Sequence, residues 1–282
     1  MDNMETTIQW LWRITKSHFN NKPNKDINIE FRHNLHIMTF NIRRDIAKDD
    51  KNNWQYRKEA IVEMIKQTAP DIICMQEVMP HMAKYLKSQL SKYYDCKGLE
   101  CFTGREITKS FCVLGEGLLT FYRKDRFDFV DKQKIKLFDG RKINLRRALV
   151  TRLYDNFKYS QIDVVNTHFC HISNEARNKS FVKLWHRYCR TYNQIADIFI
   201  CGDFNCQSFN KESGINLFTR NFSYNDFDKN VGFGTINYFS NKTKKVIDFI
   251  FSNKSIKSSR IIDSEFNNVK FISDHYPVIN IY

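Results

Sequence analysis

Acids, amides and histidines stand at the ends of apolar runs in six separate parts of the 282-residue chain. The segments are Thr39-Phe40-Asn41, Gln76-Glu77, Asn166-Thr167-His168, Gly202-Asp203-Phe204-Asn205, Asp248 and Ser273-Asp274-His275. An unpaired polar group buried at a strand end costs about 1–3 kcal/mol, so one such ending means little, but six indicate strand ends that meet at a common polar site. Carboxylates, amides and histidines together suit metal-assisted chemistry on a phosphate.

Apolar periodicity predicts the elements that must position these groups. Strands are expected at 35–42, 72–76, 118–122, 127–137, 148–154, 160–166, 198–201, 246–251, 259–263 and 278–282, and helices at 53–67, 82–90 and 175–193. Helices are interleaved with strands in both halves, and no boundary divides this body. The order predicts two sheets packed together with helices outside.

The first thirty residues have a different pattern. Residues 6–19 carry apolar side chains at helical spacing with basic residues elsewhere, which predicts an amphipathic basic helix, and 20–30 reads as a linker. The helix either packs on the protein or a partner, which we favour, or contacts a membrane surface. We therefore expect an N-terminal helix and linker over 1–30 and one larger domain over 31–282.

Charge favours acidic partners. The chain has 45 Lys and Arg against 31 Asp and Glu, a formal net charge of +14. Such a surplus favours nucleic acid, an anionic membrane or a phosphorylated small molecule. A lysine-rich composition inherited from an AT-rich genome explains it equally well, because the positive charges are spread along the chain.

The cysteines predict a reducing compartment. None of the eight forms a Cys-x-x-Cys pair, and His168-Phe169-Cys170-His171 lacks a second pair at zinc-finger spacing. Reduced thiols imply an intracellular protein, cytoplasmic or nuclear. The N-terminus lacks the features of a secretory signal, and no run approaches the roughly 18 apolar residues of a transmembrane helix, so neither is expected.

The six polar segments also occur in a known order. With Thr-Phe-Asn-Ile at 39–42 and Ile-Asp-Phe-Ile at 247–250, the sequence resembles the endonuclease/exonuclease/phosphatase superfamily from about residue 35 to residue 282. That group of magnesium-dependent phosphoesterases includes abasic-site endonucleases, pancreatic deoxyribonuclease, deadenylases, tyrosyl-DNA phosphodiesterases and neutral sphingomyelinases. The resemblance implies an α/β fold, a four-layer α-β-β-α sandwich of two mixed sheets with helices outside. It also implies Mg²⁺ as cofactor, with Mn²⁺ as a substitute.

The resemblance assigns metal ligands. Glu77 is expected to be the main ligand, with Asp274 as a further acid and Asn41 at the metal or on a phosphate oxygen. This fits the preference of Mg²⁺ for oxygen ligands and for one or two carboxylates.

The remaining roles concern proton transfer and substrate binding. Asp203 and Asn205 share one face if the segment is extended, so the acid can activate a water while the amide holds the phosphate. A helix-capping turn is the alternative for this pair. His275 is expected to donate to a phosphate oxygen with Asp248 fixing its tautomer, and His168 to be a second donor that also binds substrate.

Three functions follow. We favour a hydrolase of phosphodiester bonds, an intracellular nuclease or nucleic-acid phosphodiesterase that attacks with an activated water. The alternatives are a lipid or inositol-phosphate phosphoesterase, with residues 6–19 at the membrane, and an inactive basic binding module. A monomer is the default.

Overall fold

A computed structural model describes residues 33–101, 103–107, 115–140, 146–189, 196–208, 214–227, 234–240 and 245–282. The predicted helix and linker over 1–30 lie outside these residues. The strands are β1 (His36–Asn41), β2 (Ile72–Val78), β3 (Tyr94–Glu100), β4 (Gly117–Arg123), β5 (Phe127–Lys136), β6 (Arg147–Asp155), β7 (Ser160–His168), β8 (Asp197–Asp203), β9 (Asp248–Ser252), β10 (Ser258–Ile261) and β11 (Val278–Ile281). The helices are η1 (Ala47–Asn52), α2 (Trp54–Thr68), α3 (Pro80–Leu90), α4 (Asn174–Leu184), the π-helical turn η3 (Trp185–Cys189) and α5 (Ile215–Thr219).

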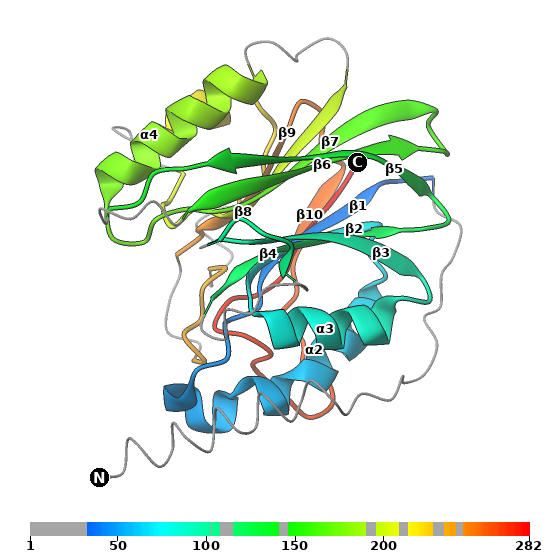
Figure 1. Cartoon of the computed structure of the whole chain (residues 1–282), viewed down its shortest axis with the longest axis vertical. Coiled ribbons are helices and arrows are strands. Elements are labelled where there is room, and N and C mark those ends of the chain that lie inside the picture. The colour runs from blue at the N-terminus through cyan, green and yellow to red at the C-terminus, as the bar shows by residue number, and fades with distance from the viewer. Residues whose placement is uncertain are drawn as a thin grey trace.

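The strands form two mixed sheets that pack face to face. One sheet has the order β10-β11-β1-β2-β4-β3 and the other β5-β6-β7-β8-β9. Helices α2 and α3 cover the outer face of the first sheet, and α4 lies on the outer face of the second (Figure 1). The predicted four-layer α/β sandwich is confirmed.

The apolar runs fill both faces of the central strands. On β1, Ile37 belongs to the core between the sheets, whereas the next residue, Met38, packs in the core that includes the helices α2 and α3. Likewise Phe199 on β8 faces the first sheet and Ile200 lies in the core with α4 and α5. Because successive side chains point to opposite faces, a strand covered on both sides reads as one continuous apolar run.

Several elements differ from the prediction, among them the short helices η1 and α5, which were not predicted. Strand β3 was not predicted, because its Asp95, Cys96 and Lys97 are half-buried and its sequence does not alternate. It pairs with β4 alone, at the edge of the sheet, where such a sequence is tolerated. Helix α4 ends at Leu184 and continues as a π-helical turn to Cys189, and residues 190–193 of the predicted helix 175–193 lie outside the described part of the chain.

A buried ion-pair network joins the sheets away from the polar strand ends. Arg126 places Nη1 3.1 Å from the Asp71 Oδ2 atom and Nη2 2.8 Å from the Asp155 Oδ2 atom. Asp71 directly precedes β2 in the first sheet, and Asp155 ends β6 in the second. All three side chains are fully buried, so each charge depends on its partners. Among the described residues, no helix is long and apolar enough to cross a membrane.

Candidate active site

Four of the polar strand ends meet at one edge of the sandwich. β1 pairs in parallel with β2, and β7 pairs in parallel with β8, so each pair carries its carboxyl ends to the same edge. The Nδ2 atom of Asn41 donates to Oε1 of Glu77 at 3.1 Å and to Oδ2 of Asp203 at 3.1 Å. Asn41 and Glu77 belong to one sheet and Asp203 to the other, so this amide joins both halves of the site.

Glu77 owes its position to an irregularity in β2. The pairing of β2 with β4 shifts register between Met75 and Val78, and Glu77 has a φ of 59°. A non-glycine residue in this region stores about 1–3 kcal/mol of strain, which recurs at functional sites. The turn aims Oε2 at the backbone amide of Arg44, which donates to it at 3.0 Å.

The surroundings of Glu77 favour its ionised form. Burial alone raises the pKa of the carboxyl, but His168, the Arg44 amide, Arg43 and Asn41 outweigh burial and lower the pKa to about 2. Glu77 is therefore a carboxylate at neutral pH.

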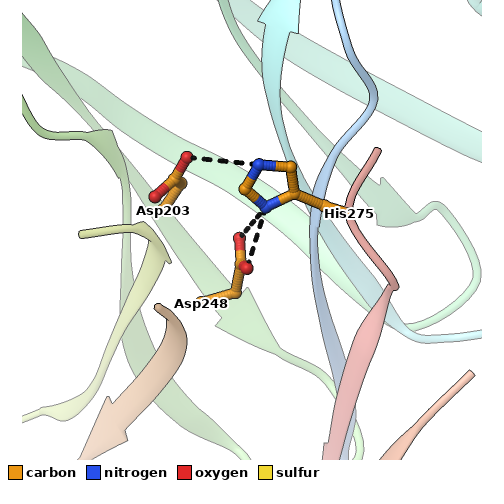
Figure 2. A group of neighbouring side chains, drawn as sticks. All are labelled: Asp203, Asp248 and His275. Carbon is orange, nitrogen blue, oxygen red and sulfur yellow. Dashed lines mark hydrogen bonds and ion pairs between the residues drawn. The ribbon is translucent and has the colours of Figure 1, made fainter. Parts of the chain in front are cut away.

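His275 stands between two aspartates from other segments (Figure 2). Its Nδ1 atom lies 2.9 Å from Oδ2 and 3.2 Å from Oδ1 of Asp248, and its Nε2 atom lies 3.8 Å from Oδ2 of Asp203. Burial disfavours the imidazolium, but Asp248 and Asp203 outweigh burial and raise the pKa of His275 well above its usual value. An acid behind a histidine fixes the tautomer and orientation of the ring.

Asp203 and Asn205 lie in a turn and not in an extended segment. Oδ1 of Asp203 accepts from the backbone amide of Asn205 at 2.9 Å, and Asn205 has a φ of 52°. The Nδ2 atom of Asn205 donates to the carbonyl of Phe169 at 3.1 Å. The extended segment expected for the pair is therefore wrong, and one of the two side-chain N–H groups of Asn205 is donated to Phe169.

Asp203 itself is buried beside other charges. Burial and the nearby carboxylate of Asp248 raise the pKa of Asp203 to about 7, against the opposing effects of His275 and the Asn205 amide. Its Oδ2 atom lies 3.5 Å from Nε2 of His168. Asp203 therefore lies close to several of the other predicted site residues.

His168 brings in an acid that the sequence did not single out. Nδ1 of His168 lies 3.9 Å from Oε1 of Glu116. Burial and the positive charge of Arg146 lower the pKa of His168 well below its usual value, against the opposing effect of Glu77. Glu116 precedes β4, which runs antiparallel to β2, so the start of β4 comes to the same edge as the end of β2. The sequence signal that could have identified Glu116 is an acidic residue directly before an apolar strand.

Ser273 anchors the last polar segment to β1. Its hydroxyl donates to the carbonyl of Asn41 at 2.7 Å, and the backbone amide of His275 donates to the same hydroxyl at 3.3 Å. Asp274 places Oδ2 3.3 Å from Nη1 of Arg43. Burial and the charge of Glu77 raise the pKa of Asp274, against the opposing effects of His275 and Arg43.

Gln76 and Asn166 belong to the polar segments but not to this site. Both are fully buried between the sheets, where Nε2 of Gln76 donates to Oδ1 of Asn166 at 2.8 Å. Nδ2 of Asn166 donates to the carbonyls of Met75 at 3.1 Å and Leu119 at 3.2 Å. The two amides link the sheets, and their role is structural.

The oxygen atoms at this edge fit a hard divalent cation. Glu77, Asp203 and Asp274 supply carboxylates, which Mg²⁺ and Mn²⁺ prefer. Asn41 turns its amide nitrogen to the carboxylates, and its Oδ1 accepts from the Arg43 amide at 3.0 Å. Ligand atoms of Asp203, Asp248 and His275 also lie within 4.8 Å of one another. Both ring nitrogens of this histidine already face carboxylates, which suits proton chemistry better than metal binding.

Comparison with known proteins decides the family. The model of the endonuclease/exonuclease/phosphatase family matches residues 38–275, which include every polar segment described above. The chain belongs to this family.

The relatives found by comparison differ widely from this chain in sequence. Carbon catabolite repressor protein 4 homolog 1 of Arabidopsis thaliana is 27% identical over 193 residues, which are 54% of this chain and 30% of that protein. A CCR4-Not complex 3'-5'-exoribonuclease subunit Ccr4 of Neosartorya fischeri is 33% identical over 88 residues, 29% of this chain and 11% of that protein. The chain thus spans less than a third of the length of these relatives. The crystal structure of an endonuclease/exonuclease/phosphatase from Bacteroides vulgatus is 26% identical with a TM-score of 0.72, covering 89% of this chain and 98% of that one.

Proposed function

We propose that this protein is a magnesium-dependent phosphodiesterase that hydrolyses nucleic acid with an activated water. The observation that carries the proposal is the contact of Asn41 with both Glu77 and Asp203, each at 3.1 Å. The two carboxylates come from different sheets, and their closeness supports a cation at Glu77 beside a water at Asp203. Family membership supports phosphoester hydrolysis as the reaction class.

The chain's own residues divide the work as follows. Asp203 orients the attacking water and accepts its proton, and its position is fixed by the Asn41 and Asn205 amides. His275, oriented by Asp248, and His168 donate to the phosphoryl oxygens, where negative charge develops. Glu77, with Asp274 nearby, would hold a divalent cation, which when bound would further stabilise that charge.

Nucleic acid is the substrate that we favour. The net charge of +14 suits a polyanion, and one relative is named as the exoribonuclease subunit of a larger complex. The lipid or inositol-phosphate alternative rested on residues 6–19, which lie outside the described part of the chain.

A phosphoester panel tests the proposal. Single- and double-stranded DNA, RNA, poly(A), sphingomyelin and inositol phosphates are incubated with Mg²⁺, Mn²⁺ or chelator, with Asp203→Asn as the blank. We expect cleavage of a polynucleotide that needs the metal, weakens as salt rises and is absent from the blank. Cleavage of lipid or inositol phosphates alone would overturn the substrate, and hydrolysis that persists in Asp203→Asn would overturn the role of that residue.

A further inference from the structure

The arginines around the site differ in how many of their donors are already used. Arg43 places Nε 2.8 Å and Nη2 3.0 Å from the two carboxylate oxygens of Asp49, and Nη1 3.3 Å from Asp274. Arg57 is fully buried and donates to the carbonyls of Ile42, Arg43, Asn52 and Ile272. Both guanidinium groups are engaged within the protein and therefore serve to hold the loops of the site.

Arg44 is different. Its side chain is 45% exposed, and its Nη1 atom lies 3.6 Å from Oε2 of Glu116, its one side-chain partner within the described ranges. That distance is too long for a good hydrogen bond, so the donors of this guanidinium face solvent. The backbone amide of the same residue donates to Glu77 at 3.0 Å, which places Arg44 at the rim of the site.

Glu116 holds a second arginine beside it. Nη1 of Arg146 lies 3.3 Å from Oε1 of Glu116, the same oxygen that lies 3.9 Å from Nδ1 of His168. Arg146 is buried, so its charge is fixed in place, whereas Arg44 is exposed on the other oxygen of the carboxylate. Two guanidinium groups therefore face one half-buried carboxylate, on the side of His168 opposite to Asp203.

Such an arrangement recognises anions. The planar guanidinium group donates two parallel hydrogen bonds to a phosphate, which a lysine cannot do. With one carboxylate between two arginines, the cluster keeps a net positive charge. The cluster lies beside Glu77 and His168, so it adjoins the place that the proposed function gives to the scissile phosphate.

We propose that Arg44, backed by Arg146 and held at the rim by Glu116, binds a second phosphate group of the substrate next to the scissile one. This inference rests on the proposed function and narrows it: the preferred substrates carry at least two phosphates, as polynucleotides and phosphorylated oligonucleotides do. Esters with a single phosphate bind without this contact.

Dinucleotides that differ by one terminal phosphate test the subsite. Dithymidine phosphate is compared with the same dinucleotide carrying an added phosphate at its 5′ or its 3′ end, and KM and kcat are measured separately. The variants are Arg44→Gln, Arg44→Lys and, as a charge-matched control, Arg220→Gln, an exposed residue directly after α5. Dissociation constants for the same ligands are measured with His275→Ala in place of the active protein, with and without Arg44→Gln.

We expect Arg44→Gln to raise KM about tenfold or more for one phosphorylated dinucleotide, to leave KM for dithymidine phosphate within about twofold, and to leave kcat unchanged. Arg44→Lys restores part of the loss, and Arg220→Gln changes nothing. Equal effects on all dinucleotides, or none, would overturn the subsite while leaving the proposed function intact. If neither a dinucleotide nor a polynucleotide of the panel is cleaved, the proposed function fails, and the dissociation constants still decide whether the added phosphate needs Arg44.

Discussion

Replacing Asn166 should lower the stability of the protein, whereas replacing His168, on the same strand, should lower its catalytic rate. Asn166 is fully buried and links the sheets, whereas His168 ends β7 beside Asp203. We predict that Asn166→Ala lowers the free energy of unfolding and leaves kcat of the folded protein unchanged. His168→Gln, of similar volume, should lower kcat and leave the free energy of unfolding nearly unchanged.

The magnitudes come from the contacts of each side chain. The amide of Asn166 makes hydrogen bonds with Gln76, Met75, Leu119 and the hydroxyl of Thr120. A hydrogen bond contributes about 1 kcal/mol net, and three acceptors share the two N–H donors, so we expect a loss of about 2–4 kcal/mol. The side-chain ion-pair distances of His168 are 3.5 Å or longer, so little stability is lost. Because the flexible glutamine side chain does not hold an N–H in the position of the imidazole, the weakened contact with the developing charge costs about 10²–10³ in kcat.

Urea unfolding followed by circular dichroism gives the free energies, and metal-dependent hydrolysis of an oligonucleotide well below the unfolding midpoint gives kcat. An Asn166→Ala protein as stable as the wild type, with a reduced kcat, would refute the separation of structural from catalytic strand ends. So would a His168→Gln protein that loses several kcal/mol and keeps its rate.

Three further outcomes follow from buried contacts. Asp248→Asn removes the charge facing the histidine of the site, so we expect kcat to fall by about 10²–10⁴ while urea unfolding shows a folded protein; an unchanged kcat would exclude the aspartate–histidine pair. Arg126→Met removes the arginine that pairs with the buried carboxylates of Asp155 and Asp71, of which Asp71 keeps Arg123 at 3.1 Å, and we expect a loss of about 3–5 kcal/mol in the free energy of unfolding by urea with kcat retained; a stable variant would show that the network is dispensable. In Gly202→Ala the new Cβ would lie 2.0 Å from the carbonyl oxygen of Thr167, so soluble yield and melting temperature should both fall sharply, and a wild-type melting temperature would show that β7 and β8 can separate at this point.

The sequence predicted most elements because the central strands are covered on both faces. Continuous apolar runs such as those around Ile73 and Ile200 leave little choice of structure, and strand ends rich in acids pointed to the site. Strand β3 was not predicted because an edge strand needs neither alternating apolar and polar residues nor high hydrophobicity.

The sequence could not tell which polar residues at a strand end reach the site. Gln76 and Glu77 are neighbours, yet Gln76 lies between the sheets, whereas Glu77 follows a backbone irregularity and contacts Asn41 at the site. The two residues can be told apart only from the strand register in the folded protein, because a shift of one residue moves a side chain to the other face of the sheet. Glu116 was missed for a related reason: it stands at the start of a strand, and the antiparallel pairing that brings it to the site is a long-range property.

The central claim is that Glu77 holds a divalent cation beside the carboxylate of Asp203, and direct measurement of Mn²⁺ binding by electron paramagnetic resonance tests it without any substrate. The account predicts saturable binding by the wild-type protein, a dissociation constant at least about tenfold weaker in Glu77→Gln, and no change in Arg220→Gln. Binding that is equally tight in Glu77→Gln, or no binding to the wild-type protein at all, would contradict it.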